Sequence, residues 1–365
     1  MTTHTFKPDM PPPVLSVGAL GWLRANLFPN WFNSLLTLFA VYLIWITVPP
    51  IIEWALIKAD WSGTTRDACT SGGACWVFIK VRLSQFLYGF YPEGLRWRVD
   101  LTVALAVLGA APLFISAMPR KLLYGLVYLI VYPLLAYWLL HGGFMGLGLV
   151  ETSKWGGLML TLVIAVIGIA GAMPLGILLA LGRRSDMPVV RVISVTFIEF
   201  WRGVPLITVL FMSSVMLPLF LPEEINIDKL LRALIAVTLF EAAYVAEVVR
   251  GGMQAIPKGQ YEAAAAMGLG YWRMMGLVIL PQALKLVIPG IVNTFIALFK
   301  DTSLVIIIGL FDLFNSIHQA TVDPAWLGFA TEGYVFAALM FWIFCFSMSR
   351  YSMRLERKLD TGHKR

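Results

Sequence analysis

The sequence has little charge for its length. Only 13% of its 365 residues are charged, against about 25% in an average soluble domain. Hydrophobic residues make up 59%, and the mean hydropathy is +0.79. This apolar excess is too large for one water-soluble core, and it excludes a disordered chain or a nucleic-acid-binding domain. The composition therefore predicts a polytopic membrane protein with a lipid bilayer, and no nucleic acid, as its partner.

Cysteine and histidine are scarce. Of three Cys residues, Cys345 lies in an apolar run, where a packed thiol is expected. Cys69 and Cys75 lie in a long polar loop, as either a small disulfide loop in an oxidising compartment or two free thiols; the bridge is the favoured alternative. None of the four His residues has ligand spacing to another His or a Cys, so no metal site is predicted.

Several functional motifs are missing. Without a G-x-x-x-x-G-K-[ST] segment the chain has no phosphate cradle of its own, and we expect no ATP hydrolysis from it. Neither paired carboxylates nor a nucleophile motif or metal-ligand cluster marks one membrane face, which argues against a membrane enzyme. The Pro-rich first 31 residues lack the short apolar region and cleavage site of a signal peptide.

Eight predominantly apolar runs are long enough to cross a bilayer, which takes roughly 20 residues per helix. They are too long and too uniformly apolar for alternating barrel strands, so we predict an all-α polytopic membrane protein with about eight transmembrane helices. The runs are Phe32–Ile52, Leu101–Met118, Leu122–Leu140, Gly156–Leu181, Val204–Leu221, Leu230–Val249, Leu286–Leu310 and Tyr334–Tyr351.

Lys and Arg residues are unevenly shared between the loops. With the N-terminus in the cytoplasm, the cytoplasmic side holds roughly twice as many of them as the outer side. The positive-inside rule therefore predicts that both termini lie in the cytoplasm. The predicted organisation is a cytoplasmic tail 1–31, a three-span extension 32–150 with a periplasmic loop 54–98, a five-span core 151–354, and a basic cytoplasmic tail 355–365.

One cytoplasmic loop, 250–285, is too long for a tight turn and too ordered in composition for a linker. Pro257 can open a helix, the alanines at 263–266 have the best helix propensity, and Gly268 can end that helix. A second short helix is expected from Tyr271 to Leu280, with a break at Pro281. The loop therefore predicts two short helices at the cytoplasmic face.

The same loop resembles the EAA loop of ABC-transporter permeases. Glu262-Ala263-Ala264, Gly268 and Leu280-Pro281 stand at the spacing of the family pattern EAA-x3-G-x9-I-x-L-P, with Val278 in place of Ile. The resemblance implies that this loop docks in a cleft of a separate ATP-hydrolysing subunit. ATP and magnesium would then be cofactors of that partner, and none is expected in this chain.

Three further segments, at 199–206, 243–252 and 300–304, resemble the polar amino acid importers within this family. The three-span extension resembles the larger permease subunits of general L-amino acid importers, the Aap/Bzt type. The resemblance implies a five-helix permease core, a periplasmic amino acid-binding protein that delivers substrate, and a second permease subunit, favoured as a homologous but different chain.

Polar residues inside the last spans are candidates for a substrate path. Lys300 and Asp301 lie roughly midway along the seventh span, where ionisable residues usually face the bundle interior. They could bind the two charges of a zwitterion or belong to an ion network that only fixes packing. Glu241 could contact substrate or a cation on another helix, and Asn293 could hydrogen-bond across helices.

Two pairs of charges have helical i, i+3 spacing near the cytoplasmic surface. Glu247 with Arg250, and Glu199 with Arg202, are predicted to form structural ion pairs, with a gate as the secondary interpretation. The main functional hypothesis is an amino acid-importing ABC permease. The alternative is an ion-coupled secondary transporter, which would explain Lys300 and Asp301 and leave the EAA loop unexplained.

Overall fold

The computed structural model describes residues 18–115, 118–222 and 227–359. They divide into two compact units, one ending at Val77 and the other beginning at Phe78. This boundary falls inside the predicted loop 54–98, whereas the sequence places its main division near residue 150. The predicted tail 1–31 holds a helix, α1, and residues 1–17 and 360–365 lie outside the described part.

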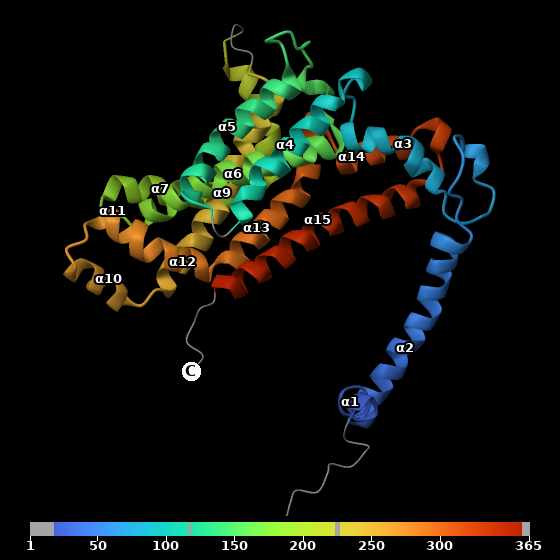
Figure 1. Cartoon of the computed structure of the whole chain (residues 1–365), viewed down its shortest axis with the longest axis horizontal. Helices are drawn as coiled ribbons and strands as arrows, with labels where there is room; N and C mark the ends of the chain where they lie inside the picture. Colours follow the sequence, from blue (N-terminus) through green and yellow to red (C-terminus); the bar gives the residue numbers. More distant parts are fainter. Residues whose placement is uncertain (1–17, 116–117, 223–226, 360–365) are drawn as a thin grey trace, which may run out of the picture. The chain divides into compact units, whose positions relative to one another are not determined.

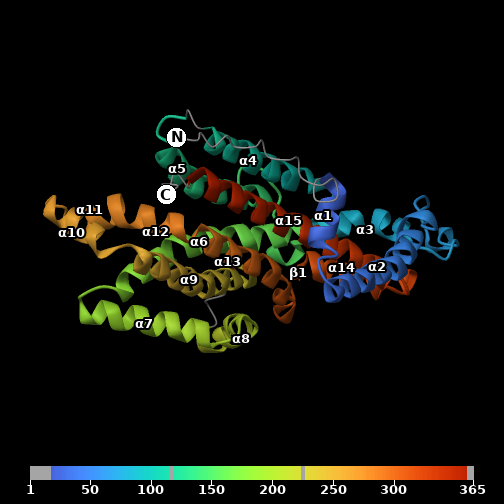
Figure 2. The same cartoon turned by 90° about the horizontal axis from the view of Figure 1, so that it is seen from below.

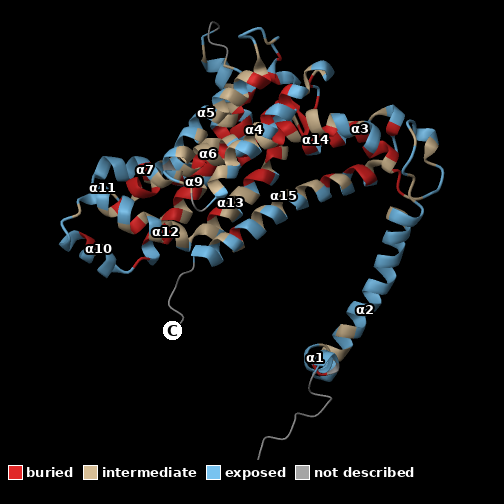
Figure 3. Ribbon diagram, in the orientation of Figure 1, coloured by how far each residue is buried: buried red, intermediate tan, exposed pale blue. Residues whose placement is uncertain are grey.

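The first unit is built around one long apolar helix. Asn30 caps it by accepting a 2.8 Å hydrogen bond from the backbone nitrogen of Asn33, and no residue of the helix is buried within its unit. Figure 3 shows the helix as almost continuously exposed surface, as expected of a segment whose environment is lipid. The elements of this unit are α1 (Gly18–Asn26), α2 (Trp31–Ile52), a π-helical turn (Glu53–Ile57) and a 3-10 turn (Arg66–Ala68).

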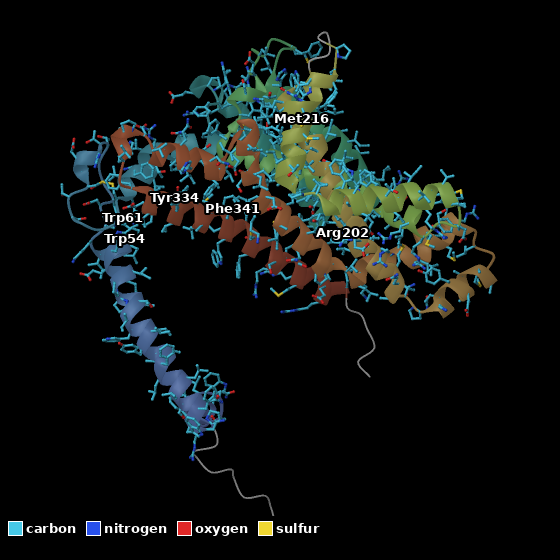
Figure 4. All side chains as sticks on the ribbon, turned by 180° about the vertical axis from the view of Figure 1, so that it is seen from behind. Trp54, Trp61, Arg202, Met216, Tyr334 and Phe341 are labelled. Carbon is cyan, nitrogen blue, oxygen red and sulfur yellow. A yellow bond between two sulfur atoms is a disulfide. The ribbon has the colours of Figure 1, made fainter. Side chains whose placement is uncertain are left out.

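A small folded loop follows α2. Cys69 and Cys75 are joined by a disulfide with their Cα atoms 5.6 Å apart. The rings of Trp54 and Trp61, both labelled in Figure 4, pack against Trp76 with centroids 6.4 and 5.8 Å away. The disulfide and the tryptophan packing thus close a loop for which the sequence favoured the disulfide and predicted no aromatic packing.

Replacing both Cys69 and Cys75 by Ser should open this loop. Removing a cross-link that closes a short loop costs about 2 kcal/mol in the chain-entropy model. Trypsin should therefore cleave after Arg66 faster in the double variant than in the wild-type protein in membranes. Cys345→Ser is the matched control, and equal cleavage rates in all three proteins would show that the disulfide does not hold the loop closed.

The second unit is a helical bundle with α6 and α9 side by side at its centre (Figures 1 and 2). Helix α7 packs on both of them, α13 and α15 pack together, and α4 and α5 form a hairpin. The α-helices are α3 (Trp76–Tyr88), α4 (Trp97–Phe114), α5 (Lys121–His141), α6 (Gly157–Arg183), α7 (Pro188–Gly203), α8 (Leu206–Phe211), α9 (Lys229–Ala255), α10 (Lys258–Ala266), α11 (Tyr271–Met274), α12 (Leu280–Leu286), α13 (Ile288–Asp301), α14 (Leu313–Thr321) and α15 (Ala330–Leu359).

Shorter elements connect these helices. Two π-helical turns extend α8 and α11, and a 3-10 segment continues α13. A two-residue strand pairs with the start of α6. These elements are 3-10 turns Glu93–Leu95, Thr152–Lys154, Leu217–Phe220, Thr302–Ile308 and Pro324–Trp326, π turns Met212–Met216 and Met275–Ile279, and β1 (Phe311–Asp312).

Among the described residues, six helices are long and apolar enough to cross a membrane, and a seventh span results if the bent pair α7–α8 counts as one. The remaining predicted span corresponds to α9, which has 27 residues but carries five charged side chains, too many for a uniformly apolar span. A helix enclosed by other helices can carry charged groups on its interior face. Each of the eight predicted runs is thus mainly helical in its described residues; the helix in Leu101–Met118 ends at Phe114.

The predicted span Val204–Leu221 differs most from expectation. Its helical part begins at Leu206 and meets α7 at an angle of 102°. Pro205 has no backbone N–H and disfavours a helical residue before it, and Val204 is accordingly extended. Helix α7 itself was not predicted from the sequence, because the charged residues of Pro188–Gly203 are typical of a cytoplasmic loop.

Close approach of α6 and α9 depends on small residues. A Cβ atom added to Gly176 would lie 2.6 Å from a Val245 methyl group and 3.0 Å from the carbonyl oxygen of Ala242. Small residues at helix interfaces allow this approach in membranes, where packing replaces the hydrophobic effect. Two buried clusters flank the contact, one centred on Leu160, Ile164 and Leu210, the other on Ile198, Val245 and Ile279.

Backbone also touches backbone where α3 ends. Gly89 has a φ of 62°, and a Cβ there would lie 2.3 Å from the Cα of Gly156. Gly157 has a φ of 61°, and a Cβ atom added to it would lie 2.5 Å from the carbonyl oxygen of Phe86. Only glycine combines this conformation with this approach. The polypeptide before α4 is therefore fitted directly against the start of α6.

Candidate functional site

The segment α10–α12 projects from one end of the second unit (Figure 1). Pro257 precedes α10, which then runs from Lys258 to Ala266 as the alanine content predicts. Glu262 and Ala263 are exposed, whereas Ala264 is buried against the rest of the segment. The helix thus has one face held by its own chain and one face open.

Gly268 ends this helix in the left-handed region. Its φ is 73°, as the predicted turn requires, and no atom of the chain lies within 4 Å of the place a Cβ would occupy. Met267 beside it is 81% exposed. The turn is therefore held by backbone conformation and leaves an open surface in front of it.

The second predicted helix is longer than expected. Helix α11, a π turn and α12 follow one another from Tyr271 to Leu286, and Pro281 causes no break. Pro281 lies in the first turn of α12, where a missing N–H is tolerated, and the preceding π turn absorbs its ring. The chain changes direction at Val287 instead, where φ is −109° and ψ is 10°. Leu280 is half-buried and Pro281 is exposed.

Three side-chain contacts attach α10 to the bundle. The guanidinium of Arg184 donates to the hydroxyl oxygen of Tyr261 at 2.8 Å and lies 5.3 Å from its ring centroid. That hydroxyl donates to the carbonyl oxygen of Met253 at 2.9 Å, and the Gln282 amide donates to Gln260 at 3.2 Å. These contacts couple the position of α10 to the ends of α6 and α9.

A cluster of five charges lies beside this attachment. Glu247 accepts from Arg250 and lies 3.5 Å from Arg183 and 3.8 Å from Arg202. Glu199 pairs with Arg183 at 2.8 Å. The cluster joins the C-terminal ends of α6, α7 and α9, and Figure 4 labels Arg202 near the corner between α7 and α8. One half-buried carboxylate therefore neutralises cations from three helices.

The Glu247–Arg250 pair is the one predicted, but the Glu199–Arg202 pair is not formed. Arg183, at the end of α6, reaches Glu199, and Arg202 turns instead toward Glu247 and the ring of Tyr244, 5.7 Å from its guanidinium. Sequence spacing cannot show that α6 ends beside α7. Arg183 was counted only as a cytoplasmic charge and was missed as a member of the site.

The candidate substrate-path residues do not form one site. Glu241 is 3% exposed, and its Oε1 has no hydrogen-bond partner among the described residues. Asp301 is half-buried at the last position of α13. Lys300 and Asn293 are exposed on α13. The structure thus buries Glu241, leaves Asp301 half-buried, and leaves Lys300 and Asn293 on the surface of the unit.

The helical span changes form directly after Asp301. Residues Thr302–Ile308 continue it as a 3-10 helix, and the hydroxyl of Ser303 donates to the carbonyl oxygen of Lys300 at 3.0 Å. No group of three His, Cys, Asp or Glu residues in the described ranges could hold a metal ion.

Comparison with known proteins assigns this architecture. Residues 172–361 match the family described as binding-protein-dependent transport system inner membrane component. The chain is 63% identical to the inner membrane amino-acid ABC transporter permease protein YhdY of Escherichia coli K12, over 97% of each chain. It is 43% identical to the glutamate/glutamine/aspartate/asparagine transport system permease protein BztC of Rhodobacter capsulatus, over 97% of this chain and 96% of that one.

A solved structure agrees with the fold over somewhat more than half of the chain. An amino acid ABC transporter crystallised with histidines is 29% identical, with a TM-score of 0.50, over 56% of this chain and 92% of that one. The shared part has the length of the predicted five-span core, and the two longer relatives also cover the extension. This chain therefore belongs to the binding-protein-dependent transport system inner membrane components, the permease subunits of ABC importers.

Proposed function

We propose that this chain is the membrane-spanning permease subunit of an ATP-driven importer of amino acids in a bacterial inner membrane. The observation that carries the proposal is the exposed face of α10, with Glu262, Ala263 and Gly268 presented at one end of the bundle. A moving partner subunit needs such a rigid, anchored and accessible helix. The names of the relatives, which include carriers of glutamate, glutamine, aspartate and asparagine, supply the substrate class.

In this proposal the energy comes from a partner. An ATP-binding subunit with its magnesium docks on α10, and the contacts of Tyr261 and Gln282 pass its movement to α6, α9 and α12. Both termini and α10–α12 lie in the cytoplasm, and a periplasmic binding protein delivers the amino acid to the opposite end. A second permease subunit, a homologous but different chain, completes the pathway.

Uptake by the reconstituted complex tests the proposal. Vesicles containing this chain, its second permease subunit and the ATP-binding subunit should accumulate labelled glutamate or glutamine when ATP and the binding protein are supplied. A proton or sodium gradient without ATP should drive no uptake. Accumulation under the gradient alone would instead support the ion-coupled secondary transporter.

Lys300→Ala and Asp301→Ala should reduce uptake more than assembly. Asp301 is half-buried where the α-helix changes to a 3-10 helix, so its charge affects the interior of the bundle. ATPase activity stimulated by substrate-loaded binding protein, measured in the reconstituted variants, checks this. Wild-type transport in both variants would refute a place in the substrate path, and failure to assemble would assign them to packing.

A further inference from the structure

A cleft of about 650 Å³ lies at the end of the second unit opposite α10–α12. Its walls come from α3, the turn before α4, and the end of α14, segments more than two hundred residues apart in the sequence. The volume is within the range of small-molecule sites. Its polar lining residues are Arg82, Gln85, Glu93, Arg96, Gln319 and Asp323.

The positive and negative charges in this cleft are equal in number. Two guanidiniums, two carboxylates and two carboxamides line it, so the lining has no net charge but both signs. Arg82 pairs with Asp323 and donates to Gln85 at 3.3 Å, and Gln85 donates to Gln319 at 3.3 Å. This chain of contacts spans the cleft from α3 to α14 and ends on a carboxamide.

The Arg96 guanidinium is held in position on the other side. It lies 5.4 Å from the ring centroid of Tyr88, whose hydroxyl donates to Asp100 at 2.7 Å, and this hydrogen bond raises the pKa of Tyr88. Glu93, which forms an ion pair with Arg96 at 3.3 Å, has a side chain that is 86% exposed. The Nε atoms of Arg96 and Arg82 are buried without a hydrogen-bond partner among the described residues. The chain alone therefore leaves these cations only partly satisfied.

We propose that this cleft binds a free zwitterionic amino acid with a polar side chain. Arg96 receives its carboxylate, Asp323 receives its ammonium group, and Gln85 with Gln319 contacts the side-chain carboxamide or carboxylate. A bidentate guanidinium–carboxylate contact and two opposite charges select a zwitterion over a simple anion or cation. The proposal rests on the proposed function for the outward position of the cleft and for the class of ligand.

Saturation-transfer NMR on the full permease complex in lipid nanodiscs tests this, with L-glutamine as the probe. Glutarate, which lacks the ammonium group, and putrescine, which lacks the carboxylate, serve as comparison ligands. Arg96→Gln and Gln319→Leu should each weaken glutamine binding about tenfold or more. Lys80→Gln, which removes a charge from the exposed side of α3, is the matched control and should bind as wild type.

Two results would overturn the proposal. Glutamine binding that both cleft variants leave unchanged would place the ligand elsewhere. Loss of stimulation by the binding protein with unchanged glutamine binding would make the cleft a contact for that protein. ATP-driven uptake by the same complexes reconstituted in sealed vesicles separates these failures from failure of the proposed function, because a complex that imports glutamine while both variants bind it normally refutes only the cleft.

Discussion

Gly268→Asp should leave the chain in the membrane and abolish stable attachment of the ATP-binding subunit. The side chain is added at a φ of 73°, where a Cβ costs on the order of 1 kcal/mol, and it enters the open surface in front of α10. Glu262→Lys on the same exposed face should have a similar effect by reversing a charge. Pull-down of the ATP-binding subunit from detergent extract, together with an uptake assay, measures both.

A pair of alanine variants separates strain from contact. Gly268→Ala and Gly270→Ala both place a methyl group where no atom of this chain lies within 4 Å. Gly270 has an ordinary φ of −66°, so only the first variant is strained. We expect Gly268→Ala to lower coupled uptake and Gly270→Ala to leave it unchanged. Normal co-purification and uptake with Gly268→Asp and Glu262→Lys would refute the coupling role, and loss of insertion would indicate a role in folding.

Glu247→Gln should destabilise the end of the bundle that carries α10–α12 by on the order of 2 kcal/mol. The substitution keeps the size of the side chain and removes the charge that faces Arg183, Arg202 and Arg250. Arg183 would then keep only Glu199, and Arg202 and Arg250 would lose the carboxylate with which each forms its ion pair. Thermal unfolding of the purified complex, followed by intrinsic tryptophan fluorescence, should show a lower midpoint.

Glu199→Gln is the control for this effect. Its side chain is 55% exposed and it pairs only with Arg183, so solvent already screens most of the interaction. We expect a shift of less than about 0.5 kcal/mol. Equal unfolding midpoints for the two variants would show that Glu247 is not the centre of the cluster.

The elements that follow from local chemistry were predicted well. The alanine run set α10, and Gly268 adopts the positive φ that the end of that helix requires. The apolar runs set the spanning helices because their length and composition alone satisfy the bilayer. The EAA spacing identified the family, which the matched relatives confirm.

The errors concern contacts between distant segments. Arg183 is 16 residues from Glu199, and Arg82 is 241 residues from Asp323, so neither pairing could be read from helical spacing. The bend at Val204 was not predicted, because the uninterrupted apolar run indicated one straight span. Pro205, however, disfavours the helical conformation of the residue before it. The continuation of the helix through Pro281 was not predicted, because no residue composition marks a π-helical turn before a proline.

The contact of Gly89 with Gly156 and Gly157 has a consequence for how such permeases can be rearranged. Because of this contact, we expect that the three-span extension cannot simply be removed before α6 or joined to another five-span core. Any recipient would need glycines at the positions of Gly156 and Gly157 and a matching turn after α3, since even one methyl group has no room there. Chimeras between long and short permeases should therefore succeed only when this backbone junction is exchanged whole.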